Sequence, residues 1–490
     1  MTPRSHTASH KPGNNPWDWY RLAQRLVSQN QPRAAAEAVA KSLQLAPDIG
    51  DFHALLARLF ITNQQRSEAL RALQNGLRRG CLHTEGWEDL AVCANLLGRQ
   101  HDAGRAFAEA LKRKPHDITL LCNAASNDLH LGQLEQARKR LQAVVQQRAD
   151  TARAWWMLAA VSTQPEKDIA AIKTLWPTTT PPRERAYLAF ALARLLEKTG
   201  QHEAAWNWAE KANRLVRKQL HHDQAHWRAR RQAHFRRQQH LLTGHQQAEA
   251  SHDHPCPVFI VGLPRAGSSL LESLLASHSN ISALGELPDL PLALARWTNT
   301  ASPEDSITVV GEDYLARVKA IHAPTSRWFT DKLPDNAQHL GYILTALPQA
   351  RIIWIDKHPM AASWSLFKQL FAQGHKPWSY HLPWLGEAIA LHHQHMTAWH
   401  QTMPQRIIRI HYEDLARNPG DQLDKIQDFL GLDNQSETLL ASQGKAVTAT
   451  ASAAQVREAI STTAVDAWRT HATELAPAKL VMDAIFPGLC

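Results

Sequence analysis

The sequence predicts two differently built parts, an N-terminal all-α repeat solenoid and a C-terminal α/β domain with a parallel central sheet. Alanines recur every 34 residues through the first 213 residues. After residue 254, short apolar runs alternate with helical stretches, which is typical of a parallel sheet covered by helices on both faces. The first of these runs leads into a glycine loop of the kind that binds phosphate. At 490 residues, the chain is also too long for one hydrophobic core.

The repeat signal consists of two alanine columns, the second twelve residues after the first. The columns are Ala23, Ala57, Ala91, Ala125, Ala159 and Ala193, and Ala35, Ala69, Ala103, Ala137, Ala171 and Ala205. Small residues allow two helices to pack closely, and this period resembles that of tetratricopeptide repeats. We expect about six stacked hairpins over residues 17–213, with weaker regularity near residues 177–182. The alternative is an alanine-rich bundle, whose spacing would drift.

Composition excludes several classes of protein. No run of about 18 apolar residues occurs, so membrane insertion is not expected. Residues 1–16 are polar, lack the apolar core of a signal peptide and are expected to be disordered. The five cysteines form no CxxC pair, which argues against disulfides or zinc and predicts a cytoplasmic protein with reduced thiols. The net charge of +9 fits polyanionic ligands, although solubility alone also explains it.

Residues 214–254 are interpreted as a basic helical linker. Between Arg214 and His240, eight arginines and lysines face the single acidic residue Asp223, a pattern that would also fit nucleic acid. Aromatic residues are few among them, so we predict a solvated bridging helix and do not expect nucleic-acid binding. The polar stretch that follows marks the start of the next domain at residue 255.

The loop GLPRAGSS, Gly262–Ser269, has the GxxxxG spacing of a P-loop between a strand and a helix. Backbone N–H groups of such a loop, together with the helix N-terminus, point at one phosphate. A nucleoside-triphosphatase has lysine after the second glycine, where this chain has Ser268. The candidate phosphate ligands are Arg265, Ala266, Gly267, Ser268 and Ser269.

With its flanks, the loop reads PVFIVGLPRAGSSLLESLLASH and resembles the 5′-phosphosulfate loop of sulfotransferases that use 3′-phosphoadenosine 5′-phosphosulfate (PAPS). It is most similar to the tyrosylprotein sulfotransferases and to bacterial proteins that join such domains to tetratricopeptide repeats. The resemblance covers the whole chain in architecture and residues from about 255 to 485 in motifs. It implies a sulfotransferase domain over residues 255–490, with PAPS as co-substrate, and a protein or peptide partner for the repeats.

A second motif, RIIWIDKHPMAASWSLFKQLF, covers Arg351–Phe371. In the family, an arginine at the end of a strand and a serine eight residues later hold the 3′-phosphate. Lys357 and Ser365 occupy these positions here. Lysine supplies the charge but not the two-pronged geometry of arginine, so a looser contact is expected.

Sulfuryl transfer needs a base for the acceptor proton and cations for the transferring and leaving groups. By resemblance, Glu286 in SALGELPDL matches the family's catalytic base. Lys332 in FTDKLPDN matches a lysine that stabilises the leaving group, and Arg265 would assist it. Ser452 in TASAAQVRE matches a serine near the bridging oxygen, although the stretch after it departs from the family pattern.

Four histidines close in sequence suggest a metal site, but they form no HExxH pattern with a third ligand. They are His392, His393, His395 and His400. We interpret them as packing or surface residues and expect no metal.

The sequence therefore predicts sulfuryl transfer from PAPS to an acceptor hydroxyl, with the repeats recruiting or presenting the acceptor. The resemblance favours peptide tyrosine, although no acceptor pocket can be read from the sequence. Two alternatives stay open. One is a repeat scaffold whose sulfotransferase domain has lost activity, and the other is a kinase, which Ser268 in place of the lysine opposes.

Overall fold

A computed structural model describes residues 13–244, 255–300, 306–372, 374–441 and 462–490. The chain forms two compact units, Met1–Asn127 and Asp128–Cys490. Most of the segment expected to be disordered, residues 1–12, lies outside the described residues, and the first helix begins at Pro16. No helix among the described residues is long and apolar enough to span a bilayer.

The predicted all-helical repeat region is confirmed. Its helices are α1 (Pro16–Ser28), α2 (Pro32–Leu45), α3 (Gly50–Thr62), α4 (Arg66–Arg79), α5 (Thr84–Leu96), α6 (Gln100–Arg113), α7 (Ile118–Leu131), α8 (Leu134–Gln147), α9 (Ala152–Val161), α10 (Pro165–Leu175), α11 (Pro182–Lys198) and α12 (His202–Arg217). In the first unit, α1 packs with α2, α3 with α4, and α5 with α6. In the second unit, α9 packs with α10, and α11 with α12.

The two alanine columns form the buried contacts of these helices, as their spacing predicted. Every member is buried except Ala171, which lies on α10 and is partly exposed. The α9–α10 pair is also the shortest, with helices of 10 and 11 residues. Regularity is therefore weakest where residues 177–182 interrupt the pattern.

The predicted parallel sheet is also confirmed. It has five strands in the order β2-β3-β1-β4-β5, and all the strand pairs are parallel. The strands are β1 (Cys256–Gly262), β2 (Ile281–Ala283), β3 (Trp328–Asp331), β4 (Arg351–Asp356) and β5 (Ile407–His411). The chain leaves β1 to one side for β2 and β3 and returns to its other side for β4. Ligands bind at such a switch point, outside the carboxyl ends of the strands.

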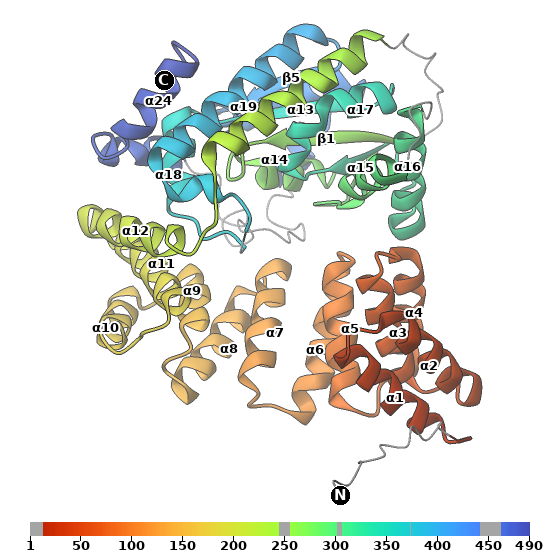
Figure 1. Ribbon diagram of the computed structural model, residues 1–490. Helices are drawn as coiled ribbons and strands as arrows, with labels where there is room; N and C mark the ends of the chain where they lie inside the picture. The colour runs from red at the N-terminus through yellow and green to blue at the C-terminus, as the bar shows by residue number, and fades with distance from the viewer. Residues whose placement is uncertain (1–12, 245–254, 301–305, 373, 442–461) are drawn as a thin grey trace, which may run out of the picture. The chain divides into compact units, whose positions relative to one another are not determined.

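Helices cover both faces of the sheet (Figure 1). Alternate residues of β1 belong to two separate cores. Val258 and Ile260 lie in the core that includes residues of α14, α18 and α19, whereas Phe259 and Val261 lie in the core formed with α15, α16 and α17. These helices are α14 (Ser268–Leu275), α15 (Asp289–Thr300), α16 (Thr308–His322), α17 (Leu340–Ala346), α18 (Pro359–Phe367) and α19 (Leu382–Thr402). Burial on both faces explains why the two central strands, β1 and β4, are largely apolar.

Five further α-helices follow β5 among the described residues. They are α20 (Tyr412–Arg417), α21 (Pro419–Leu430), α22 (Ser436–Ala441), α23 (Thr463–Asp466) and α24 (Ala476–Ile485). Of these, α24 packs against α19, and α20 follows β5 directly.

The basic segment predicted to be a solvated linker is packed where it is described. Helix α13 (Gln224–Gly244) runs alongside α19 (Figure 1). Arg228 on α13 forms an ion pair with Glu387 on α19, at 2.8 Å. Phe235 stacks on His395 with ring centroids 4.0 Å apart, and Gln238 accepts a hydrogen bond from the backbone N–H of Gly341. Because its polar and aromatic residues have partners in the α/β part, α13 belongs to the helical layer of the sheet.

Candidate active site

The candidate functional residues lie at the carboxyl ends of the strands. Since all five strands are parallel, these ends meet at one edge of the sheet. The residues that follow the strands include Arg265 in the loop after β1, Glu286 after β2, Lys332 after β3, Lys357 after β4 and Tyr412 after β5. Segments distant in the sequence therefore bring a carboxylate, three cations and a phenol to the same edge.

The backbone of the loop after β1 explains its glycines. A Cβ on Gly262 would lie 2.4 Å from the backbone oxygen of Ile355, so the close approach of β1 and β4 requires glycine there. Gly267, at the N-terminus of α14, has a φ of +104°, and a Cβ on it would lie 2.4 Å from Cδ2 of Tyr412. Arg265 also has a positive φ, +69°, which is uncommon for a residue with a side chain.

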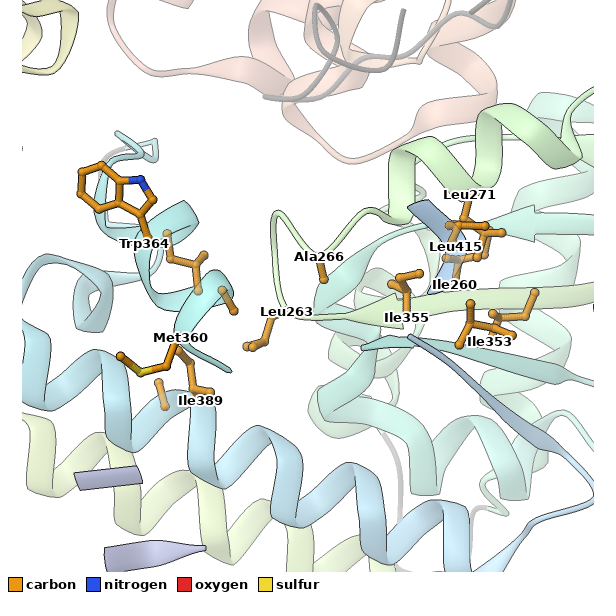
Figure 2. Close-up of a cluster of buried hydrophobic side chains, with 14 of the residues drawn as sticks. Ile260, Leu263, Ala266, Leu271, Ile353, Ile355, Met360, Trp364, Ile389 and Leu415 are labelled. Atoms are coloured by element: carbon orange, nitrogen blue, oxygen red, sulfur yellow. The ribbon is translucent and has the colours of Figure 1, made fainter. Parts of the chain in front are cut away.

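The apolar residues of the loop fix it to the domain core. Figure 2 shows Leu263 and Ala266 between the strand residues Ile260 and Ile355 and the α18 residue Met360. All five are buried members of one cluster. These apolar contacts therefore hold the loop in place against the domain core.

Lys357 is a buried cation without an ion-pair partner among the described residues, although the charge of Glu413 acts on it. Its side chain is 6% exposed and makes no hydrogen bond or ion pair with them. The ammonium instead lies 4.4 Å from the ring centroid of Tyr412, in a cation–π contact. Burial, followed by the nearby charges of Arg265 and Lys368, lowers the pKa of Lys357 to about 7. An unpaired buried ammonium is a strong physical indication of an anion site.

Ser365, the other predicted 3′-phosphate residue, lies on α18, which begins two residues after Lys357. It is partly exposed. The start of this helix is fixed by α20, because Glu413 Oε1 accepts a hydrogen bond from the backbone N–H of His358 at 3.0 Å. Lys357 and α18 are thus tied to the segment that carries Tyr412.

Glu286 and Lys332 form an ion pair between the ends of β2 and β3. Lys332 Nζ lies 2.9 Å from Glu286 Oε1, and the lysine side chain is 1% exposed against 38% for the glutamate. Hydrogen bonds to Glu272 on α14 hold the loop that carries Glu286 next to β3. The Glu272 carboxylate accepts one from the Gly285 N–H at 2.9 Å and one from the Thr330 hydroxyl at 2.7 Å. The structure therefore brings together the residues predicted as base and leaving-group cation.

Arg265 lies among other cations. Burial, followed by the charge of Arg194, lowers the pKa of Arg265 to about 10. Lys368, one residue beyond α18, also has a lowered pKa because of burial and the charges of Arg265 and Arg194, while Glu197 opposes the shift. Positive charge is therefore concentrated between the phosphate loop and α18.

Two predictions about this region have different outcomes. Ser452 lies outside the described residues, so its proposed role stays a prediction. Of the four histidines, His392, His393 and His395 are buried, as expected of packing residues. No group of three or more His, Cys, Asp or Glu side chains suited to a metal ion occurs in the part of the chain that the structure describes.

Comparison with known proteins identifies the two parts of the chain. Residues 257–436, which hold the loop and the strand-end residues, match the sulfotransferase family. This region is a sulfotransferase-family domain. Residues 55–118 and 97–161 match tetratricopeptide repeats, so the repeats precede the sulfotransferase domain, as the sequence predicted.

Relatives of the chain are distant. It is 26% identical over 409 residues to a protein of Aquifex aeolicus (strain VF5), a match that covers 79% of this chain and 53% of that protein. The chain thus spans about half the length of this relative. A "Putative protein-tyrosine sulfotransferase" of Caenorhabditis briggsae is 21% identical over 234 residues, which cover 43% of this chain and 80% of that protein. The sulfotransferase domain of the Synechococcus PCC 7002 olefin synthase is 22% identical with a TM-score of 0.35, covering 48% of this chain and 98% of that domain.

Sequence reasoning missed three residues near the sulfotransferase site. Tyr412 follows β5, and no sequence signal connected it with Lys357. Lys368 follows Ser365 by three residues on the same helical face, so helical spacing could have found it. Glu197, its partner, lies on the repeat helix α11, and only the fold brings it to the site.

Proposed function

We propose that this chain transfers a sulfuryl group from PAPS to an acceptor hydroxyl. The observation that carries the proposal is Lys357, a buried ammonium without an ion-pair partner among the described residues. It lies against the Tyr412 ring, and a Cβ on Gly267 of the phosphate loop would meet the same ring. A nucleotide with anionic groups at both its 3′ and 5′ ends would supply the missing negative charge. The sulfotransferase-family match of residues 257–436 supports the same class of reaction.

The residues present fit such a nucleotide. The loop residues from Arg265 to Ser269 would hold the 5′ end through backbone N–H groups, hydroxyls and the guanidinium. Lys357 and Ser365 would hold the 3′-phosphate. PAPS supplies an activated sulfuryl group and leaves as adenosine 3′,5′-bisphosphate (PAP). Burial of the cations strengthens their interaction with anionic groups, because less water screens their charge.

The ion pair of Glu286 and Lys332 fits the proton transfer and the departure of the leaving group. The Glu286 carboxylate, more exposed than its partner, would take the proton of the acceptor hydroxyl while the new oxygen–sulfur bond forms. Lys332 would steady negative charge on the oxygen that leaves, with help from Arg265. The proton would end on Glu286, and the charge that develops would face two fixed cations. No metal ion is needed to ionise water in this scheme.

We further propose that the helical repeats recruit or present the acceptor, since tetratricopeptide arrays offer extended surfaces for peptides or proteins. The named relative from Caenorhabditis briggsae supports a tyrosine hydroxyl as the first acceptor to test. Lys357, at the position predicted to hold the 3′-phosphate, offers a single charge and not the two parallel hydrogen bonds of an arginine. We therefore expect binding of the 3′-phosphate to depend on neighbouring cations as well.

Calorimetric titration of the full chain with PAP, without added metal, tests this proposal. We expect the wild type to bind, Glu286→Ala to bind with similar affinity, and Arg265→Ala to bind at least about tenfold more weakly. These results would place PAP against the loop and leave Glu286 for the acceptor. No heat of binding with the wild type, even at millimolar PAP, would refute the enzyme reading and favour a repeat scaffold.

A further inference from the structure

The last repeat hairpin, α11–α12, is built into the sulfotransferase core. Ala193, Trp206 and Ala209 belong to the same buried cluster as the phosphate loop residues Leu263 and Ala266. Both helices lie in the same compact unit as the sheet. The hairpin therefore cannot move independently of the loop without exposing a shared apolar core.

Direct contacts tie this hairpin to α18, the helix that carries Ser365. Trp206 stacks on Trp364 and Phe367 with ring centroids 5.4 and 5.2 Å apart. Asn213, buried on α12, donates a hydrogen bond of 2.7 Å to the backbone oxygen of Phe367. The position of α18 is therefore fixed from the repeats as well as from the sheet.

A polar contact continues this interface on α11. Glu197 accepts hydrogen bonds from Lys368 Nζ at 2.6 and 2.8 Å and from Trp364 Nε1 at 2.9 Å. These hydrogen bonds hold Lys368 against α11. The charge of Glu197 also acts on Arg194 and Arg265, but its ion pair is with Lys368.

Arg194 lies one helical turn before Glu197 and faces the same side of α11. It is partly buried and makes no hydrogen bond or ion pair with the described residues. Glu197, on that side, accepts hydrogen bonds from Lys368 and Trp364, so this side of α11 faces α18. Ala193, the residue before Arg194, packs in the same cluster as Leu263 and Ala266 of the phosphate loop. In keeping with this placement, the charge of Arg194 lowers the pKa of both Arg265 and Lys368.

We propose that Arg194, from the repeat region, is a nucleotide-binding residue that completes the cationic site for PAPS. The inference rests on the proposed function and extends it beyond residues 257–436, which match the sulfotransferase family. An arginine here adds a two-pronged phosphate donor to a site whose strand-end residue is lysine. The repeat region is then part of the cofactor site, in addition to any role in acceptor recruitment.

Calorimetric titration of the full chain with PAP and with adenosine 5′-monophosphate tests the inference in Arg194→Met and Arg194→Lys. The matched control is Arg183→Met, which removes an exposed arginine from the same helix about three turns away. We expect Arg194→Met to weaken PAP binding about ten- to hundredfold, Arg194→Lys to recover part of the loss, and Arg183→Met to match the wild type. Thermal melting without ligand serves to confirm that the variants are folded.

The outcomes separate this inference from the function on which it rests. If the wild type binds PAP and Arg194→Met binds it equally well, the role of Arg194 is refuted while the proposed function stands. If the wild type does not bind PAP, both are refuted. If Arg194→Met fails to fold, the PAP affinity of the folded Arg194→Lys variant tests the inference instead. An affinity equal to that of the wild type, at both low and high salt, would refute a two-pronged phosphate contact by Arg194.

Discussion

Lys332 and Glu286 join the ends of β3 and β2 through an ion pair of 2.9 Å, with the lysine buried and the carboxylate turned toward solvent. The backbone supports the pair, because the Lys332 N–H donates to the Gly285 oxygen at 2.8 Å. The carboxylate is thus presented to an incoming molecule from a fixed position. This geometry suits a base that must reach an acceptor, and the buried lysine suits a fixed charge beneath it.

Replacing Glu286 by glutamine should remove the base and leave the nucleotide site intact. We expect kcat for sulfuryl transfer to fall about 10²- to 10⁴-fold, while PAP affinity changes less than about threefold. Steady-state kinetics and calorimetry on the same preparation measure the two quantities. A variant that loses PAP binding in proportion to activity would argue that Glu286 only supports the fold of the site.

PAP binding should depend on pH through Lys357. Its folded pKa of about 7 lies below the ordinary value of 10.5, because burial and neighbouring cations disfavour the charged form. A bound phosphate favours the charged form, so binding above pH 7 takes up a proton. PAP affinity should therefore fall as the pH rises from 7 to 9, by at most about tenfold per unit. Calorimetry in buffers of different ionisation enthalpy measures the proton uptake.

The matched variant is Lys357→Arg, since an arginine stays charged throughout this range. Its PAP affinity should change less between pH 7 and 9 than that of the wild type. The same shift has a consequence without ligand: between about pH 7 and 10.5, the unfolded state holds the Lys357 proton more tightly, so this residue makes stability rise with pH. Identical pH profiles for wild type and variant would assign the titration to another group.

Gly267→Ala should damage the phosphate loop through a specific clash. The position has a φ of +104°, and the new Cβ would lie 2.4 Å from the Tyr412 ring. Gly200→Ala is the control, because its φ is +74° and a Cβ there meets nothing within 4 Å. We expect the control to lose about 1 kcal/mol of stability and Gly267→Ala to lose more, together with PAP binding. Equal losses in thermal melts, with PAP binding kept in both, would contradict the packing of Tyr412 against the loop.

Glu197→Gln should destabilise the interface between the last hairpin and α18. Burial raises the pKa of Glu197, but Lys368 and the Trp364 N–H outweigh it, and the net pKa is lowered from its ordinary value of 4.5. We expect a loss of about 2 kcal/mol in urea unfolding at pH 7. Since a lowered carboxyl pKa stabilises only above the unfolded value, the difference should shrink as the pH falls below 4.5. A difference that is independent of pH would mean that the Glu197 charge is not what holds Lys368.

The sequence was most informative where a local pattern of residues determines the structure. Alanine spacing predicted the repeats because only small residues fit at the helix crossings, and Ala171 is the partly exposed exception in the shortest pair. The loop glycines and strand-end residues could be read because each lies next to a strand. The parts of Tyr412 and Glu197 could not be read from the sequence, since their contacts with Lys357 and Lys368 depend on how distant segments pack together. The basic residues of α13 suggested a solvent-exposed helix. Their partners, such as Glu387 for Arg228, could not be foreseen because they lie more than a hundred residues away in the sequence.

The central claim is that this chain moves a sulfuryl group from PAPS, and PAP formation measured with the full chain tests it most directly. The assay would offer tyrosine peptides, simple phenols and sugars as acceptors, with the wild type beside Glu286→Gln. We predict acceptor-dependent PAP formation by the wild type for at least one of these classes, reduced at least about 100-fold in the variant. PAP formation at the buffer rate with every acceptor, from a protein that still binds PAP, would contradict the claim and leave a nucleotide-binding scaffold.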